Sequence, residues 1–137
     1  MLRLLHRVAL CIAVALSPMI ALAQTEEGPD DVYRAYHETL LRSFNEQPIL
    51  SYLTRAARDD FLSRYVGQQR TQVFFMMKSS APRNVHIAAV EIQCALATLT
   101  LEGRDVGNYS TVGTAQMELE DGEWRIADVT WIAGSRR

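Results

Sequence analysis

The segment from Gly113 to Ile132 constrains the fold of this chain more than any other part of the sequence. Asp121-Gly122 is a typical two-residue hairpin turn, because a type I′ turn needs a positive φ at both central positions. A turn at this point pairs apolar residues on one face and opposite charges on the other: Leu119 with Trp124, Met117 with Ile126, and Glu118 with Arg125. The sequence therefore predicts a long antiparallel hairpin at the C-terminus.

The second strand of this hairpin carries an interruption in its pattern. Strict alternation would place Val129 and Trp131 on the face opposite to Ile126. A β-bulge near Ala127-Asp128 would return them to the same face and bend the strand sharply. We therefore expect the hairpin to be curved.

The N-terminal half of the chain has helical periodicity. An apolar stripe at i, i+4 spacing predicts a helix that begins near Pro29 and ends before Pro48. Its members are Val32, Tyr36, Leu40 and Phe44, with Tyr33 and Leu41 beside them. A brief helical turn is expected at 49–53. Thr54 is a predicted N-cap for a helix over 55–66, and a third long helix is expected over 68–79.

From Pro82 onward the period changes to that of β-strands. Four strands are predicted, over 84–92, 94–102, 109–119 and 123–132. Three long helices followed by four sequential strands indicate an α+β domain, in which the helices cover one face of a curved antiparallel sheet and leave a cone-shaped space. We expect a flexible leader at 24–29 and a single domain over 30–137.

The N-terminus resembles a secretory signal peptide. Basic residues precede an apolar stretch from Val8 to Ile20, and Ala21-Leu22-Ala23 forms a typical cleavage site. We expect cleavage after Ala23 and a periplasmic or secreted bacterial protein; an uncleaved membrane anchor is the alternative. Cleavage would remove Cys11 and keep Cys94, which we expect to be buried because it begins an apolar strand.

Charge and motifs exclude several classes of function. The formal net charge of −2 gives no basic surface for nucleic acid or anionic lipid. His37 and His86 have no partner at metal-ligand spacing, and the sequence contains neither a nucleophile elbow nor a glycine-rich phosphate loop. We therefore expect no metal, no cofactor, no nucleic-acid partner and no membrane span after cleavage.

The order of elements and the terminal hairpin G-T-x-x-M-x-x-E-D-G-E-W-R-I-x-D-V-x-W resemble the nuclear transport factor 2-like superfamily. Its small exported bacterial, lumazine-binding-like members are the most similar. The resemblance implies a cone with a pocket between the helices and the concave sheet. The superfamily includes isomerases, dehydratases, ligand binders, immunity proteins and assembly modules, so the fold alone does not select a function.

The resemblance suggests two sets of site residues. The candidates for lining a ligand pocket are Tyr33, Tyr36, Met76, Met117, Trp124 and Trp131. An enzyme of the isomerase or dehydratase type would use Tyr36 as a proton donor and His37 or Asp128 as a base. The alternative is that the tyrosines belong to the core, that His37 is solvated, and that Asp128 hydrogen-bonds to the backbone at the bulge.

Two patterns suggest association with another protein. The run Phe74-Phe75-Met76-Met77 points around more than one side of its helix, which indicates either burial on all sides or an adaptable binding surface. Strict alternation predicts that the segment from His86 to Leu101 is apolar on both faces, which favours a homodimer through the sheet. We predict an exported non-enzymatic domain that binds a small apolar ligand or a protein partner, with an immunity or envelope-assembly subunit as a further alternative.

Overall fold

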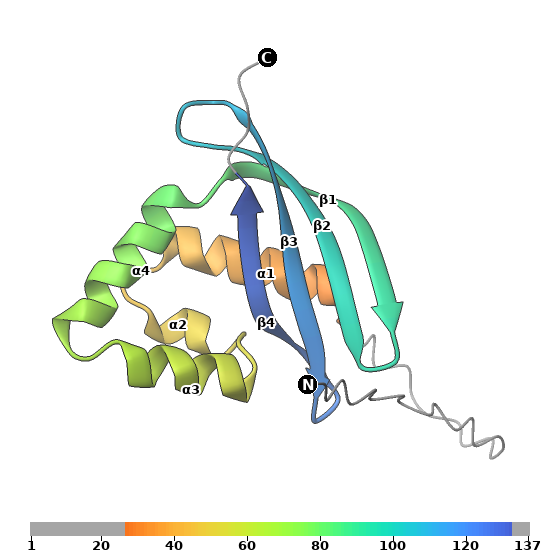
Figure 1. Cartoon of the computed structure of the whole chain (residues 1–137), viewed down its shortest axis with the longest axis horizontal. Coiled ribbons are helices and arrows are strands. Elements are labelled where there is room, and N and C mark those ends of the chain that lie inside the picture. The colour runs from red at the N-terminus through yellow and green to blue at the C-terminus, as the bar shows by residue number, and fades with distance from the viewer. Residues whose placement is uncertain (1–26, 133–137) are drawn as a thin grey trace, which may run out of the picture.

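The computed structural model describes residues 27–132, and within that range the chain forms four helices and four strands. The helices gather on one face of a curved, open antiparallel sheet with strand order β1-β2-β3-β4 (Figure 1). The elements in chain order are α1 (Pro29–Arg42), α2 (Gln47–Leu50), α3 (Arg55–Arg64), α4 (Gln68–Ser80), β1 (Arg83–Gln93), β2 (Leu96–Arg104), β3 (Ser110–Glu120) and β4 (Glu123–Ile132). The α+β prediction is confirmed. The fourth helix is α2, which forms where a brief turn was expected. The predicted signal peptide lies outside the described residues.

The C-terminal hairpin has the predicted turn and register. Asp121 and Gly122 have φ values of 51° and 80°, as a type I′ turn requires. All three expected cross-strand pairs are present. The register shifts between Gln116 and Met117, which leaves Ala127 as the extra residue of a bulge in β4. The bulge turns Val129 and Trp131 toward the core, together with Ile126, so the predicted curvature is confirmed.

Gly113 allows Trp131 to lie against the hairpin. The two residues face each other across β3 and β4. A Cβ atom at Gly113 would lie 2.7 Å from both the Thr130 carbonyl oxygen and the Trp131 ring. Only glycine leaves room for this close approach between the indole and the neighbouring strand.

Helix α1 packs its apolar stripe against the sheet, and Val32, Tyr36 and Leu40 are buried. The prediction for Phe44 was wrong. The helix ends at Arg42, so Phe44 falls in the following turn, where it is 83% exposed and lies under the Lys78 ammonium group at 5.4 Å. The early helix end breaks the i, i+4 spacing that had placed Phe44 in the core.

The segment that joins α2 to α3 covers the free edge of β4. The Thr54 amide donates to the Ile126 carbonyl, and the Ile126 amide donates to the Tyr52 carbonyl, both at 2.8 Å. Leu53 thereby forms a short parallel bridge with Ile126. Thr54 also caps α3 as predicted, since its hydroxyl accepts from the Ala57 amide at 3.1 Å.

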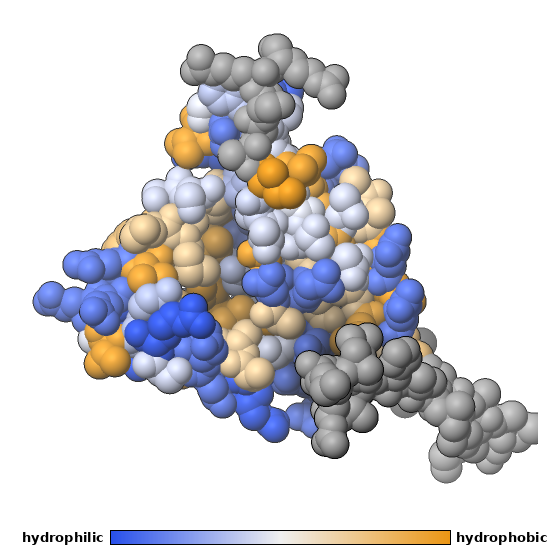
Figure 2. Space-filling model, viewed as in Figure 1, coloured by the Kyte–Doolittle hydropathy of each residue, from blue (hydrophilic) through white to orange (hydrophobic). Residues whose placement is uncertain are grey.

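Helix α4 packs against the core chiefly through Phe74. Phe74 is fully buried and Met77 partly so, whereas Phe75 and Met76 are exposed. Of the two interpretations of this apolar run, burial on all sides is therefore wrong. Figure 2 shows strongly hydrophilic side chains over α3 and apolar patches over α4.

Strand β1 is an edge strand with irregular register. Shifts occur between Arg83 and His86 and between Ile87 and Ala89. The second shift places Ile87, Val90 and Ile92 on the same concave face, so the interpretation that this region is apolar on both faces was wrong.

The convex face of the sheet is largely polar. Cross-strand pairing aligns Thr100, Thr114 and Thr130 in one row and Thr98, Gln116 and Asp128 in the next. Thr98 donates to Gln116, and Thr130 donates to Asp128, both at 3.0 Å. The sequence pattern that suggested a homodimer through the sheet is therefore not present on the convex face. The homodimer stays a prediction, and light scattering tests it.

Cys94 is exposed, contrary to the prediction of burial. It lies in the turn between β1 and β2 with a φ of 54°, and β2 begins two residues later, at Leu96. The apolar run after Cys94 hid this turn, because none of its residues is a common turn former.

A single core occupies most of the space between the helices and the sheet. Its fully buried large side chains are Tyr33, Ile49, Phe74, Leu99, Leu101, Met117 and Ile126. Trp124, Val129 and Trp131 pack against this core from β4. Within residues 27–132, the helices are all too short or too polar to cross a bilayer.

Candidate functional site

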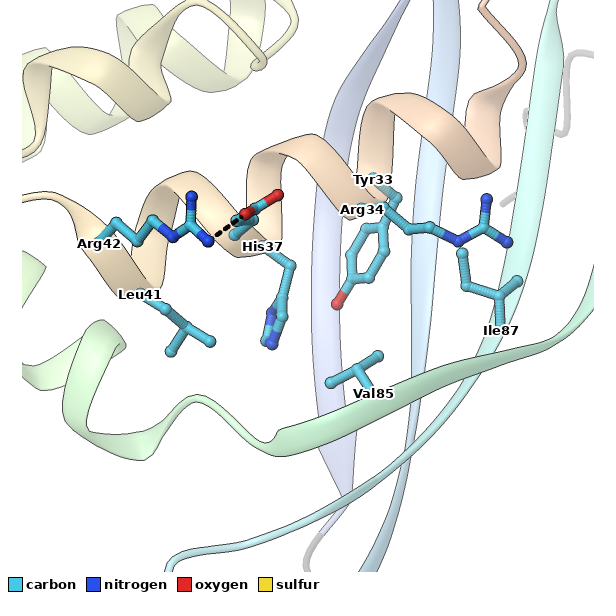
Figure 3. A pocket seen from close by; sticks show the side chains of 8 residues that line it. Tyr33, Arg34, His37, Leu41, Arg42, Val85 and Ile87 are labelled. Carbon is cyan, nitrogen blue, oxygen red and sulfur yellow. Dashed lines mark ion pairs between the residues drawn. The ribbon is translucent and has the colours of Figure 1, made fainter.

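A pocket of about 340 Å³ lies between α1 and the start of β1. Figure 3 shows side chains from α1 and β1 that line it, with the rings of Tyr33 and His37 projecting from the helix toward β1. The lining residues are Tyr33, Arg34, His37, Glu38, Leu41, Arg42, Val85 and Ile87. The spacing of Tyr33, His37 and Leu41 by four residues places them on one face of α1.

The walls of the pocket are mainly apolar. Leu41, Val85 and Ile87 supply aliphatic surface, and the rings of Tyr33 and His37 stack with a centroid distance of 6.1 Å and an interplanar angle of 17°. Val85, which lies between Arg83 and His86, falls within the first register shift of β1.

Two buried polar atoms of the pocket residues lack a hydrogen-bond partner within the described part of the chain. They are the Tyr33 hydroxyl oxygen and Nε2 of His37. In folded proteins such groups nearly always find a partner in the protein, in water or in a ligand. Because Tyr33 and His37 both line the cavity, it is the strongest candidate for a binding site among the described residues.

Burial sets the protonation states of the aromatic groups. It lowers the pKa of His37, against the opposing effect of a hydrogen bond to the Pro82 backbone, so the imidazole is neutral at pH 7. Burial also raises the pKa of Tyr33, with a smaller contribution from Tyr36, and raises the pKa of Tyr36 to about 12. Both phenols keep their protons at neutral pH.

The charges at the rim pair with one another on α1. Arg34 contacts Asp30 at 2.9 Å and Asp31 at 3.1 Å, and Arg42 contacts Glu38 at 2.7 Å. The rim therefore has little net charge to attract an ion.

One of the six predicted pocket residues, Tyr33, lines this pocket. Tyr36 and Met117 are core residues instead, Trp124 and Trp131 pack against the core, and Met76 is 69% exposed on α4. Leu41, Val85 and Ile87 line the pocket but were not among the predicted pocket residues. The i, i+4 relation of Leu41 to His37 was a usable signal, whereas the contribution of β1 depends on its bulges.

The three candidate catalytic residues do not meet. Tyr36 is buried in the core, and His37 faces the pocket. Asp128 lies on the convex face of β4, where it is exposed and accepts a hydrogen bond from Thr130. The bulge at Ala127 separates Asp128 from the core-facing side chains of the strand, so Tyr36, His37 and Asp128 do not form one site.

A second cavity, of about 450 Å³, lies at the β3–β4 turn. It is lined by Ser51, Leu53, Arg55, Arg58, Glu120, Asp121, Glu123 and Arg125. Most of its charged groups already contact one another: both Glu120 oxygens accept from the Arg55 amide, Arg55 pairs with Asp121, and Arg125 contacts Glu123 and the Ser51 carbonyl. Among the described residues, no group of three His, Cys, Asp or Glu side chains is placed to hold a metal ion.

Comparison with solved structures shows the fold. Among the similar structures is a protein described as an NTF2-like transpeptidase from Campylobacter jejuni, with a TM-score of 0.55 and 14% identity over 74% of this chain and 99% of that one. NTF2-like proteins of unknown function from Shewanella baltica and Silicibacter pomeroyi give TM-scores of 0.52 and 0.50, with 10% and 16% identity. They align with 76% and 75% of this chain and with 89% and 90% of their own.

No family model and no curated protein matches the sequence. At identities this low, the structural likeness shows the nuclear transport factor 2-like fold and no more.

Proposed function

We propose that this chain, which has the nuclear transport factor 2-like fold, is an exported domain that binds a small, neutral, largely apolar ligand between α1 and β1. The observation that carries the proposal is the cavity itself, which combines aliphatic walls with two buried polar atoms that have no partner within residues 27–132. Ligand sites commonly join an apolar surface to a few such polar groups.

The neutrality of the ligand follows from the charges around the site. Arg34 and Arg42 are the basic residues of the rim, and each is paired with an acidic residue of α1. An anion would have to compete with these pairs, and a cation would have to leave water for an aliphatic wall. A neutral molecule meets neither cost.

The export part of the proposal depends on residues 1–23. Their basic start, apolar stretch and Ala21-Leu22-Ala23 end support secretion across a bacterial inner membrane. Expression of the full chain with a C-terminal tag, followed by cell fractionation and mass determination, tests it. We expect a periplasmic or secreted product that begins at Gln24, and retention of the intact chain in the membrane would contradict export.

Binding is tested with N-phenyl-1-naphthylamine, a neutral apolar probe whose fluorescence rises in apolar surroundings. Leu41→Gln places a polar group in the pocket and should weaken probe binding about tenfold, because a buried leucine contributes roughly 1.5–3 kcal/mol. Leu119→Gln is the matched control, since Leu119 is 39% exposed and Leu41 37%. If both variants weaken saturable probe binding equally, or if neither weakens it, the probe does not bind in the pocket between α1 and β1.

Association with a protein partner through α4 is the second candidate function. The exposed side chains of Phe75 and Met76 favour it, because isolated domains seldom expose neighbouring large apolar residues on one helix. Light scattering of the purified protein tests whether it self-associates, and Met76→Glu should abolish a self-association through α4. If the protein is a monomer, the partner must be a different protein, such as an envelope-assembly protein or a toxin.

A further inference from the structure

Strand β1 is an open edge of the sheet. It pairs only with β2, so along one side of Arg83–Gln93 no strand lies beside it in the described part of the chain. Between residues 84 and 93 the sequence has neither proline nor lysine, two residue types that commonly keep an edge strand from pairing with another chain. Most side chains of the strand are exposed, including Val90 at 40% and Ile92 at 54%. The edge can therefore accept a further strand.

The chemistry of β1 is symmetric about the bond between Ala88 and Ala89. The segment Asn-Val-His-Ile-Ala-Ala-Val-Glu-Ile-Gln, residues 84–93, reads amide, aliphatic, polar, aliphatic, alanine from either end. Antiparallel pairing of two copies about a twofold axis at this bond would therefore match each residue type with its own kind, and a histidine with a glutamate. The pairs, with the second residue from the other copy, are Ala88–Ala89, Ile87–Val90, His86–Glu91, Val85–Ile92 and Asn84–Gln93.

The second register shift of β1 makes this symmetry hold on both faces of the strand. In a regular strand, Ile87 and Val90 would lie on opposite faces and could not be directly opposite in an antiparallel pair. The shift leaves Ala88 as an extra residue, so Ile87 and Val90 both pair with buried residues of β2 and share the concave face. His86 and Glu91 pair with β2 residues of the convex face. The two halves of β1 therefore match face by face.

We propose that two copies of this chain associate through their β1 strands, which pair antiparallel about the Ala88–Ala89 bond and join the two sheets into one. On the convex face, the imidazole of His86 in one copy donates to the Glu91 carboxylate of the other, and the twofold axis repeats this contact. On the concave face, the aliphatic pairs place apolar surface against apolar surface. An unrelated strand could satisfy the backbone of the edge, but only a second copy provides both sets of matched side chains.

The association would also extend the wall of the pocket. Val85 and Ile87 line the pocket, and in this register they lie opposite Ile92 and Val90 of the second copy. Those two side chains are exposed in a single copy. The inference does not rest on the proposed function, because the strands can pair whether or not a ligand binds.

Sedimentation velocity of the protein purified after expression of the full chain tests the association. One strand pair is a small interface, so we expect a dimer with a dissociation constant on the order of 10 μM, which separates into monomers on dilution.

Lysine substitutions at two exposed valines locate the interface. Val90→Lys places a charge against Ile87 of the second copy and should weaken the dimer about tenfold or more, because lysine on an edge strand disfavours pairing. Val112→Lys is the matched control, since Val112 is 49% exposed but lies on the convex face of β3, and it should leave the affinity unchanged. Met76→Glu, on α4, should also leave it unchanged.

The register is tested by one substitution in two backgrounds. In the wild type, Glu91→Arg removes both contacts with His86 and should weaken the dimer about fivefold. In His86→Glu, where two carboxylates face each other, the same Glu91→Arg creates an opposite-charge pair and should strengthen the dimer about fivefold. The change of sign is specific to this register, and an equal effect of Glu91→Arg in both backgrounds would overturn it.

Two further outcomes would overturn the proposal. One is a wild-type protein that is still a monomer at about 1 mM. The other is a dimer that Val112→Lys or Met76→Glu disrupts and Val90→Lys does not, because such a dimer forms through the convex face or through α4. Thermal unfolding of each variant confirms that it is folded. Failure of N-phenyl-1-naphthylamine to bind would contradict the proposed function and leave the dimer unaffected.

Discussion

The two edges of the sheet have opposite characters. The β4 edge is closed by the chain itself, through the backbone bonds of Tyr52 and Thr54 to Ile126. The β1 edge has no such cover among the described residues, and two register shifts interrupt its pairing. Each edge has a cavity beside it, and the one near β4 is the larger, at about 450 Å³ against about 340 Å³.

This comparison shows that cavity size is a poor guide to function in this molecule. The cavity near β4 is lined by charged groups that contact one another, so its polar groups need no ligand. The cavity near β1 is smaller, but two of its lining residues, Tyr33 and His37, each have a buried polar atom without a partner in residues 27–132. We infer that the β4 side stabilises the fold and that the β1 side binds.

The largest expected effect comes from isoleucines at the two edges. Ile126→Ala should lower the free energy of unfolding by about 2–5 kcal/mol, because Ile126 is a fully buried core residue. Ile87→Ala should lower it by only about 1 kcal/mol, since Ile87 is half-buried at the pocket. Urea unfolding measures both. Equal losses would contradict the division between a stabilising edge and a binding edge.

Gly113 gives a second test of the β4 side. Gly113→Ala would press a methyl group into the Trp131 ring and the Thr130 carbonyl, and overpacking of this kind costs about 1–3 kcal/mol. Thr114→Ala, one residue along on the convex face, is the control and should change the free energy of unfolding by less than about 0.5 kcal/mol. If thermal unfolding shows no difference between the two variants, Trp131 does not pack as described.

A smaller effect is expected where α3 begins beside the β4 edge. Thr54→Ala removes the hydroxyl that accepts from the Ala57 amide and should cost about 1 kcal/mol in the free energy of unfolding. Thr54→Ser keeps the cap and should recover most of the loss. A serine variant as unstable as the alanine variant would indicate that the methyl group of this buried threonine matters more than its hydroxyl.

The smallest effect concerns pH on the β1 side. Burial lowers the pKa of His37 in the folded protein below its ordinary value of 6.5. As the pH falls below 6.5, the unfolded chain takes up a proton at this residue that the folded chain refuses, so this residue makes folding less favourable. Urea unfolding at pH 7.5 and 5.5 should show a smaller loss of stability for His37→Gln than for the wild type.

His86→Gln is the control for this pH experiment, because His86 is an exposed residue of β1 that does not line the pocket. If His37→Gln and the wild type lose the same stability between the two pH values, His37 is not buried in its neutral form.

The sequence predicted the β4 side of the molecule better than the β1 side. The hairpin could be predicted because its turn, charge pairs and bulge all depend on residues that are close in the sequence, such as Asp121-Gly122 and Ala127. The bulge in β1 has no such local signal. The faces on which Ile87 and Val90 lie are set only when β1 pairs with β2. The sequence therefore predicted wrongly that the convex face is apolar, and it did not predict that β1 lines the pocket.

The candidate site was predicted only in part for the same reason. Tyr33 and His37 were identified because the periodicity of α1 placed them beside the apolar stripe. Met76 and Trp131 were assigned to the pocket from the cone shape that the resemblance implied. Their positions depend on how far α4 stands from the sheet and on the close approach at Gly113, which no short-range pattern encodes.

The most direct test of the two-edge account is an NMR titration of the ¹⁵N-labelled protein with N-phenyl-1-naphthylamine. We predict amide shifts that saturate with ligand and cluster in residues 33–42 of α1 and 83–87 of β1, around the smaller cavity. Shifts that cluster instead in residues 51–58 and 120–125, around the charged cavity, would contradict the assignment of binding to the β1 edge.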